Sequence, residues 1–277
     1  MKLNHTLNNE VMAYLSEDIG SGDLTAAIIP EDNIAEAVVA TREDMVLCGK
    51  PWFDAIFEQL DKQVHITWLI AEGYYVEAGT ELCQLTGNAR ALLTGERTAL
   101  NLLQALSATA TVARNYAQAV AGTDCKILDT RKTIPGLRMA QKYAVECGGC
   151  YNHRIGLFDA ILIKENHIIA AGSIAQAVAR ARQSTTVPVE VEVENLDEFQ
   201  QALDAKPDRI MLDNFSLTDM RAAVEKKAGQ IELEASGNVE LSNIRSVAET
   251  GVDYISVGAL TRNIKAIDLS MRISFKE

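Results

Sequence analysis

Six short apolar runs recur after residue 125, separated by segments that are mostly long enough for a helix. Strand–helix alternation at this spacing predicts a parallel sheet, because parallel neighbours need a crossover between them. Six units in series indicate an α/β barrel or a near-barrel. The runs are KILDT, DAILI, VPVEVEV, DRIMLD, IELEA and DYISV, which begin at Lys126, Asp159, Val187, Asp208, Ile231 and Asp253. Helices are expected at Leu137–Glu146, Ser173–Arg182, Asp197–Ala205, Thr218–Ala228 and Leu241–Thr250.

The residues before this alternation follow a different pattern. Strand-like runs separated by turns extend from Ala35 to Leu85, with a helix expected at Trp52–Leu60, and they predict an antiparallel sheet with a helix on it. Apolar residues at helical spacing over Ala91–Val120 predict at least two consecutive helical segments. The loop Glu17–Thr25, rich in Gly and Asp, is either a surface turn or a loop folded over a site.

Polar residues gather where the predicted strands end. In parallel α/β folds these ends lie on one face, so residues far apart in sequence can line one pocket. The strand-end residues are Arg131, Lys164, Glu192, Asp213, Ser236-Gly237-Asn238 and Ser256-Val257-Gly258. The last two groups offer small residues and backbone N–H groups after consecutive strands, which is typical of phosphate-binding loops in barrels.

Cations form three clusters in the same region, Arg131-Lys132, His153-Arg154 and Lys164. The net charge of −12 argues against nucleic-acid binding, which needs a basic surface. Local cations in an acidic protein therefore favour a small ligand with several negative charges.

The strand-like run Val189–Glu194 alternates valine with glutamate. Alternation places Glu190, Glu192 and Glu194 on one face. Because the outer face of a barrel packs on helices, the glutamates are expected to point into the lumen, where they need cations or hydrogen bonds. An edge strand with a solvated face is the alternative.

Five cysteines in a chain expected to be cytoplasmic should be reduced thiols. Cys147 and Cys150 have CxxC spacing, but they end a helical segment instead of opening one, and no second metal-binding pair accompanies them. They are expected to be small apolar residues beside a glycine turn. The N-terminus has no apolar signal region and no long apolar run occurs, so the chain is expected to be untargeted, without a membrane span.

These motifs together carry a family resemblance. The segments GERTALNLLQ, LDTRKTIPGLR, KYAVECGGCYNHRIGLFDAILIKENH, EVEVEN, MLDN, EASGN and GVDYISVGALT occur in order, and EDIGSGDLT precedes them. The chain resembles quinolinate phosphoribosyltransferases over nearly its whole length. It departs from them at Cys150, where the family has a glycine.

The resemblance implies a type II phosphoribosyltransferase fold. This comprises an N-terminal open α/β sandwich (1–114), an incomplete α/β barrel (115–265) and a C-terminal segment (266–277) that returns to the first domain. It implies transfer of phosphoribose from phosphoribosyl pyrophosphate to quinolinate with loss of carbon dioxide, a requirement for magnesium, and a homodimer or an assembly of dimers.

The resemblance also implies roles for particular residues. Lys132, Lys164, Glu192 and Asp213 would be catalytic, and the last two would bind magnesium through water or substrate. Arg97 would reach the pocket of the other subunit, although a charged Glu96-Arg97 pair on a helix is usually a solvated face. The residues implied to contact substrates are Arg97, Thr130, Arg131, Lys132, His153, Arg154, Lys164, Glu192, Asp213, Ser236, Gly237, Asn238, Ser256, Val257 and Gly258.

Three alternatives remain open at this point. A Schiff-base aldolase could use Lys164 on a barrel strand, but that chemistry does not account for the excess of arginine. A catalytically silent anion-binding barrel would gain nothing from the inward carboxylates Glu192 and Asp213. A related phosphoribosyltransferase associated with molybdenum transport shares the fold, but the NHR and KENH segments fit quinolinate enzymes better.

Overall fold

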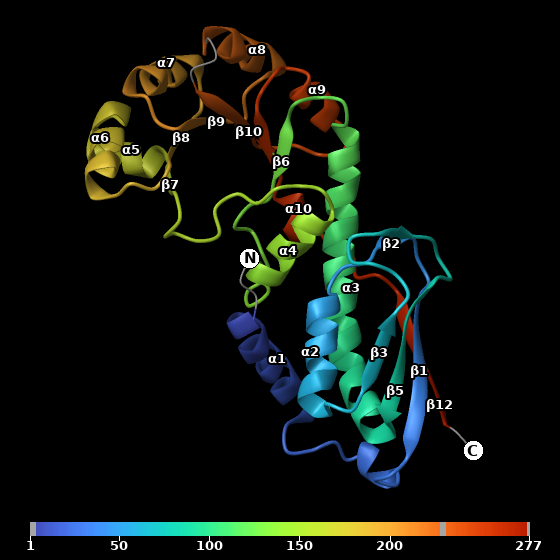
Figure 1. The fold of residues 1–277 in the computed structure, drawn as a ribbon. Coiled ribbons are helices and arrows are strands. Elements are labelled where there is room, and N and C mark those ends of the chain that lie inside the picture. Colours follow the sequence, from blue (N-terminus) through green and yellow to red (C-terminus); the bar gives the residue numbers. More distant parts are fainter. Residues whose placement is uncertain (1–3, 228–230, 276–277) are drawn as a thin grey trace. The chain divides into compact units, whose positions relative to one another are not determined.

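The computed structural model describes residues 4–227 and 231–275 of the 277-residue chain. The chain divides into two compact units, Met1–Val112 with Ile264–Glu277, and Ala113–Asn263. Both boundaries lie two residues from the predicted ones at 114/115 and 265/266. The first boundary falls within a single long helix (Figure 1).

The N-terminal unit is built on an antiparallel sheet whose strand order is β12-β1-β5-β3. Alternate residues of β1 are buried, which gives the sheet one apolar face. The C-terminal strand β12 pairs with β1 along its whole length, which is the return that the resemblance implied. The strands are β1 (Ile34–Thr41), β3 (His65–Trp68), β5 (Glu81–Asn88) and β12 (Leu269–Phe275), with a separate pair β2 (Met45–Val46) and β4 (Tyr75–Val76).

The helices of this unit are α1 (Asn4–Ile19), α2 (Lys50–Leu60) and the first part of α3 (Ala89–Ala119), with a 3₁₀ turn η1 (Ala26–Ile28). Helix α2 buries one apolar face that includes Trp52, Phe53 and Phe57. The prediction of two helical segments after residue 90 is wrong, because α3 is one continuous helix of 31 residues. Its glycine, Gly95, leaves room for α2 to pack closely and does not interrupt it.

The predicted loop Glu17–Thr25 begins in the last turn of α1, which ends at Ile19, and continues as a turn that contacts α3 within the N-terminal unit. The Asp23 carboxylate accepts hydrogen bonds from the backbone N–H groups of Thr25 and Ala26, both at 2.9 Å, and so holds the start of η1. Its other oxygen accepts a hydrogen bond from the hydroxyl of Thr94 on α3 at 2.8 Å. These contacts lower the pKa of Asp23.

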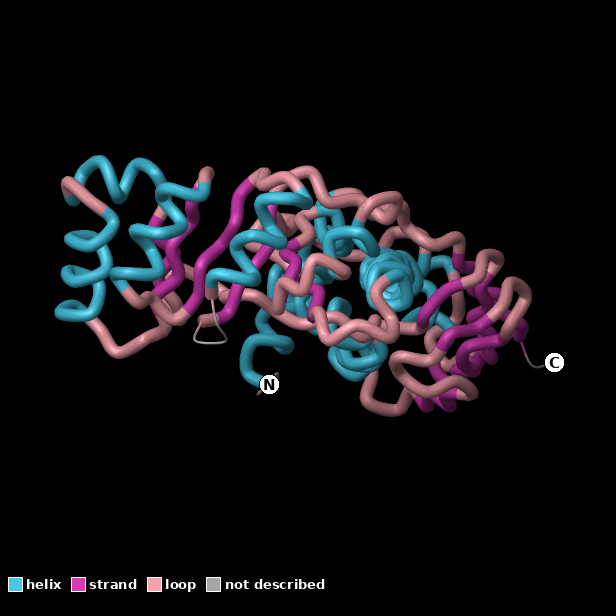
Figure 2. The backbone as a smooth tube through the Cα atoms, turned by 90° about the horizontal axis from the view of Figure 1, so that it is seen from above, coloured by secondary structure: helices cyan, strands magenta, loops and turns pink. Residues whose placement is uncertain are grey.

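The C-terminal unit contains the six predicted strands in one parallel sheet, in the order β6-β11-β10-β9-β8-β7. The sheet curves into an arc that is open between β6 and β7, as expected for an incomplete barrel (Figure 1). Seen from above, the strands follow one another side by side (Figure 2). They are β6 (Lys126–Leu128), β7 (Ile161–Ile163), β8 (Val189–Val193), β9 (Arg209–Asp213), β10 (Glu232–Ser236) and β11 (Tyr254–Ser256).

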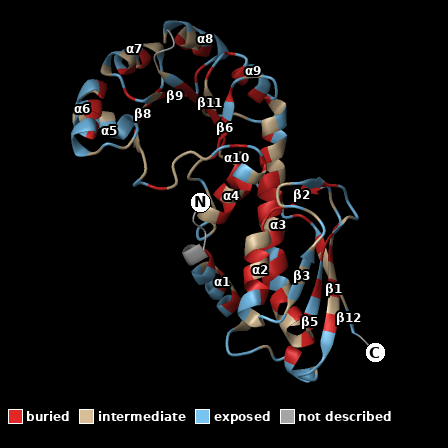
Figure 3. Cartoon of the chain, viewed as in Figure 1, coloured by how far each residue is buried: buried red, intermediate tan, exposed pale blue. Residues whose placement is uncertain are grey.

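Helices α6 to α9 cover the convex side of this arc with their buried faces turned to the strands (Figure 3). Ser173, Asn195 and Ser216 each accept a hydrogen bond from a backbone N–H of the first turn, which explains where α6, α7 and α8 begin. The helices are α4 (Arg138–Cys147), α5 (Glu165–Ala171), α6 (Ile174–Ser184), α7 (Leu196–Ala205), α8 (Leu217–Lys226), α9 (Ile244–Ala248) and α10 (Ala259–Arg262).

Two predicted helices have ends that the structure changes or does not describe, and two short helices, α5 and α10, were not predicted. The helix expected at Leu241–Thr250 is only the short α9, and the expected end at Ala228 lies outside the described residues. Helices α5 and α10 are too short to show a clear apolar period. Across the described residues, no helix combines the length and apolar character needed to cross a bilayer.

Substitution of Gly95 by alanine tests the packing of α2 on α3. A Cβ atom there would lie 2.7 Å from Phe57 and 2.8 Å from Leu60. Although alanine favours helix, the overlap is expected to lower the free energy of unfolding by about 1–3 kcal/mol in urea denaturation. Phe57→Leu should relieve part of that cost, so the double variant should be less destabilised than the sum of the single ones. Additive effects would show that the two helices do not meet at this position.

Candidate active site

A cavity of about 480 Å³ opens at the carboxyl ends of the strands in the C-terminal unit. Ten of the residues predicted to bind substrate line it, which is the convergence expected of parallel strands. The lining residues are Thr130, Arg131, Lys132, His153, Arg154, Leu162, Lys164, Glu192, Met211, Asp213, Glu234, Ser236 and Ser256.

The loop after β6 carries Arg131 and Lys132 and is fixed by α4. Arg138, in the first turn of α4, donates to the Thr133 hydroxyl at 3.0 Å and to the Arg131 carbonyl at 3.4 Å. Gln141, one turn further along, accepts from the N–H of Ile134 at 2.8 Å. Arg131 and Lys132, which line the cavity, therefore lie on a loop whose backbone is held by hydrogen bonds from side chains of α4.

Arg131 and Arg154 crowd positive charge at one side of the cavity. Burial, and then the charge of Arg131, lower the pKa of Arg154. The Nε atom of Arg131 is buried and has no hydrogen-bond partner in the described part of the chain. Two guanidinium groups placed together with donors to spare are an arrangement suited to an anion.

Carboxylates on the neighbouring strands β8 and β9 line the same cavity. Glu192 is largely buried at the end of β8 and forms an ion pair with Lys164, the residue that precedes α5. Asp213 ends β9, and one of its oxygens accepts a hydrogen bond from the Asn214 side chain at 2.9 Å. The cavity therefore has a cationic side and an acidic side within one volume.

His153 lies beneath the cavity among buried charges. Its Nε2 atom is 2.9 Å from Glu190 and 3.3 Å from Glu234, and Arg209 donates to the same Glu234 oxygen at 3.0 Å. Burial alone would lower the pKa of His153, but the two carboxylates raise it to about 9. The backbone nitrogen of Arg154 lies 2.8 Å from Nδ1, which can accept its N–H only in the neutral ring, whose proton then lies on Nε2, toward the carboxylates.

A second buried ion pair joins the loops that carry the cations. Asp129, at the end of β6, and Lys142 of α4 are both fully buried, with Nζ and Oδ1 2.5 Å apart. The same Asp129 oxygen accepts the N–H of His153 at 2.8 Å, and Lys142 donates to the His153 carbonyl at 3.2 Å. Burial raises the pKa of Asp129 to about 6 despite its cationic partner.

Several predicted residues do not line the cavity. Gly237 and Asn238 line a neighbouring hollow and pack against Asn214. The N–H of Val257 donates to the Leu128 carbonyl at 2.9 Å, so it is not available to a phosphate. Gly258 lies directly behind the cavity, where a Cβ atom would be 3.1 Å from the Lys132 side chain.

The prediction that all three glutamates of Val189–Glu194 point into the lumen is correct for Glu190 and Glu192 but wrong for Glu194. Strand β8 ends at Val193, and the N–H of Glu194 donates to Glu198 of α7 at 2.9 Å. Glu194 is therefore exposed at the start of the loop.

Arg97 belongs to the N-terminal unit. It lies on α3 with an exposed side chain, 3.8 Å from Glu96.

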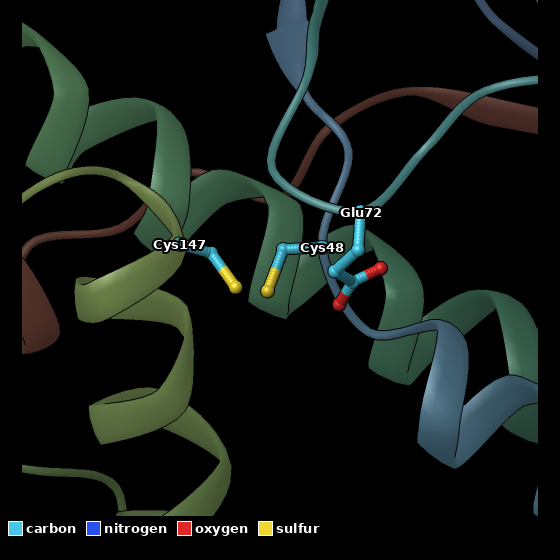
Figure 4. Close-up of side chains that lie close together, drawn as sticks. All are labelled: Cys48, Glu72 and Cys147. Carbon is cyan, nitrogen blue, oxygen red and sulfur yellow. The ribbon is translucent and has the colours of Figure 1, made fainter.

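The five cysteines, all of which the structure describes, form no disulfide. Gly149 adopts a positive φ in the turn after α4, and the buried thiol of Cys150 donates to the Ala113 carbonyl at 3.1 Å. Burial raises the pKa of Cys150 to about 12, so this thiol is a packing group with a local donor. In the N-terminal unit Cys48 is buried, and the Glu72 carboxylate accepts the N–H groups that open α2 (Figure 4).

Sequence patterns missed Glu234, Arg209 and the Asp129–Lys142 pair. Glu234 had a signal, because Glu232 and Glu234 alternate with apolar residues in IELEA as the glutamates do in the preceding glutamate-rich run. Lys142 had no such signal, because a lysine within a helix is normally exposed to solvent.

Loss of the buried lysine should be costly. Lys142→Met leaves Asp129 buried without its cation and should lower the free energy of unfolding by about 3–5 kcal/mol. Arg182→Met is the matched control in the same unit, because Arg182 pairs with Asp208 at 2.8 Å but both side chains are over 40% exposed. The control should cost less than about 1 kcal/mol in the same urea titration followed by circular dichroism. Equal costs would contradict the burial of the Asp129–Lys142 pair.

Comparison with known proteins identifies the family. The family description "Quinolinate phosphoribosyl transferase, C-terminal domain" matches residues 109–272, and the corresponding N-terminal domain matches residues 23–107. A "Probable nicotinate-nucleotide pyrophosphorylase [carboxylating]" of Synechocystis is 44% identical, covering 94% of this chain and 90% of that protein. A Bacillus subtilis protein of the same description is 41% identical, covering 94% and 91%.

Solved structures agree with these sequences. The nicotinate-nucleotide pyrophosphorylase from Francisella tularensis superposes with a TM-score of 0.94 at 50% identity, covering 98% of this chain and 97% of that one. The resemblance found in the motifs extends over both domains and the three-dimensional fold, and the chain belongs to the quinolinate phosphoribosyltransferase family.

Proposed function

We infer that the chain transfers the phosphoribosyl group of phosphoribosyl pyrophosphate to quinolinate, with release of pyrophosphate and carbon dioxide, to give nicotinate mononucleotide for NAD biosynthesis. The carboxylating and decarboxylating enzymes to which it is similar carry this activity in their names. The observation that carries the inference is the single cavity in which Arg131, Arg154 and Lys164 face Glu192 and Asp213.

The cationic side of the cavity suits quinolinate. This substrate carries two adjacent carboxylates, and planar guanidinium groups bind carboxylates through two parallel hydrogen bonds. We propose that Arg131 and Arg154 hold the carboxylates, with Lys164 beside them and His153 behind Arg154. The spare Nε donor of Arg131 supports this assignment.

We assign the phosphates of phosphoribosyl pyrophosphate to the other end of the cationic side of the cavity. Lys132 would contact the leaving pyrophosphate as negative charge builds on its oxygens, with Thr130, Ser236 and Ser256 as hydroxyl donors. These residues line the same cavity, and the loop that carries Lys132 is anchored through the Thr261 hydroxyl, which donates to the Lys132 carbonyl at 2.8 Å.

The acidic side suits the ribose and a metal ion. Glu192 and Asp213 would bind the ribose hydroxyls and offset the positive charge that develops at the anomeric carbon. Their carboxylate oxygens are also the hard donors that magnesium prefers, held through water or substrate. Magnesium, when bound, would neutralise pyrophosphate charge.

Decarboxylation follows from the first step. Once the ring nitrogen carries ribose, its positive charge stabilises the electron pair left on the carbon that loses carbon dioxide, so no separate organic cofactor is needed. The ion pair of Lys164 with Glu192 speaks against a Schiff-base mechanism, since such a lysine needs a depressed pKa and a neutral amine.

The substrate assignment is tested by comparing quinolinate with nicotinate. Nicotinate lacks the second carboxylate and would leave part of the cationic wall unpaired, so kcat/KM should be lower by on the order of 10² or more. Glu192→Ala and Asp213→Ala should each lower kcat by on the order of 10² with the fold retained. Formation of nicotinate mononucleotide with magnesium present is the measurement. Comparable use of nicotinate would contradict the assignment.

We also propose a cytoplasmic homodimer, or an assembly of dimers, in which Arg97 completes the site of the partner subunit. The family resemblance supports this proposal, and the exposed position of Arg97 on α3 leaves its side chain accessible. A site shared across a two-fold axis has a distinctive consequence for mixed assemblies.

Complementation tests the shared site. Arg97→Ala and Lys164→Ala proteins should each be inactive, but a mixed dimer would contain one intact site built from both chains. Random co-refolding makes about half of the dimers mixed, so up to roughly a quarter of wild-type activity should return. Mixed dimers verified by mass spectrometry without recovered activity would place Arg97 outside the partner's site. Refolding each variant alone is the control.

A further inference from the structure

Buried charges fill the barrel lumen directly below the active cavity. Glu190, Glu234 and Arg209 lie here, and His153 and Arg154 line both the active cavity above and a second cavity of about 430 Å³ below. Pro188, Asp208 and Glu232, at the amino ends of neighbouring strands, line the lower cavity. His153 and Arg154 therefore separate two hollows at opposite ends of the lumen.

The strand register explains why these charges meet. Glu190 on β8 lies opposite Arg209 on β9, and Arg209 lies opposite Glu232 on β10. Two residues further along β10, Glu234 points to the same side and lies opposite Tyr254 on β11. The guanidinium of Arg209 also stacks on the Tyr254 ring, with 3.9 Å between its central carbon and the ring centroid. Four adjacent strands thus place their inward side chains in one layer.

Glu234 is the centre of this layer. It is fully buried, and its Oε2 atom meets both Arg209 at 3.0 Å and His153 at 3.3 Å. Its Oε1 atom and the Oε1 atom of Glu190 are buried and make no hydrogen bond within the described residues. Two buried carboxylates facing one guanidinium leave negative charge that the protonated ring of His153 is placed to offset.

His153 transmits this arrangement to the active cavity. Nε2 faces the two glutamates, while Nδ1 lies 2.8 Å from the backbone nitrogen of Arg154. The orientation of the ring therefore fixes the backbone of the residue whose guanidinium lines the quinolinate pocket.

We propose that Glu234, with Arg209 behind it, is a positioning residue for quinolinate binding that holds His153 and, through His153, Arg154. This inference rests on the function proposed above and adds to it a residue of the cavity lining that acts through His153. The charged groups that face or surround His153 are Glu190 of β8, Arg209 of β9, Glu234 of β10, Asp129 after β6, Lys142 of α4 and Arg154 beside it.

Three variants separate the roles of shape and charge. Glu234→Ala removes both, Glu234→Gln keeps the shape and an acceptor but removes the charge, and Glu232→Gln is the matched control. Glu232 contacts the same Arg209 at 3.3 Å and the Tyr254 hydroxyl at 2.9 Å, yet it is half exposed, and its contacts are with Arg209 and Tyr254, away from His153.

Steady-state kinetics give the first measurement. Glu234→Ala should raise KM for quinolinate by on the order of 10-fold, and KM for phosphoribosyl pyrophosphate and kcat should change less than about threefold. Glu234→Gln should recover part of the loss, because it preserves the acceptor, and Glu232→Gln should match the wild type. A folded Glu234→Ala protein with unchanged KM for quinolinate would overturn the proposal.

Nuclear magnetic resonance of labelled histidine gives a measurement that needs no turnover. The chain has four histidines, so the His153 signal can be assigned by its loss in His153→Gln. Because both glutamates raise the pKa of His153, Glu234→Gln should lower it, whereas Glu232→Gln should leave it unchanged. A His153 titration unaffected by Glu234→Gln would overturn the positioning role, whichever anion the cavity binds.

Two further outcomes are distinguishable. If the wild type fails to use quinolinate while His153 still responds to Glu234→Gln, the proposed function is wrong, and only the coupling of Glu234 to His153 and Arg154 is supported. The ligand atoms of His153, Glu190 and Glu234 lie within 4.8 Å of one another, a spacing that a divalent ion could also use. A stoichiometric metal retained by the wild type after dialysis and lost in Glu234→Gln would overturn the proposal in favour of a metal site.

Discussion

The need to balance buried negative charge governs the C-terminal unit. Asp129, Glu190 and Glu234 are all buried, and an isolated carboxylate in such a place would be strongly unfavourable. Each has a cationic or protonatable neighbour from another element: Lys142 from α4, Arg209 from β9, or His153 from the loop before β7. These pairs connect loops and strands that the hydrogen bonds of the sheet do not join. These buried pairs therefore hold the loops that carry the cationic side chains of the cavity.

Periodicity in the sequence was sufficient for the strands and for the face on which the site lies. The alternation Val189–Val193 located the inward glutamates, and the residues after each strand converged as parallel topology requires. The alternation could not show where β8 ends, and that point decides that Glu192 faces the cavity whereas Glu194 does not. One residue beyond a strand end the rule of alternate sides no longer holds.

Other features depended on contacts that sequence spacing does not record. Helix α3 was predicted as two segments, with Glu96-Arg97 interrupting its apolar pattern, yet it is continuous, and Gly95 beside this pair is a point of close packing against Phe57 and Leu60. The sequence places Val257 in a predicted phosphate-binding loop, but its N–H donates to the carbonyl of Leu128 on the adjacent strand. The family motif EASGN begins with the buried Glu234, but the resemblance assigned that residue no role.

The pairing of β12 with β1 means that the N-terminal sheet is completed late in synthesis. Ala35 lies opposite Phe275, so the sheet includes residues from nearly both ends of the chain. During synthesis β1, β5 and β3 leave the ribosome long before the strand that covers the other edge of β1. That edge offers unpaired backbone groups until β12 appears, while the intervening α/β unit, with its neighbouring strands mostly close in sequence, can form first. A chain that lacked only β12 would keep its cavity-lining residues and yet expose a strand edge to other chains.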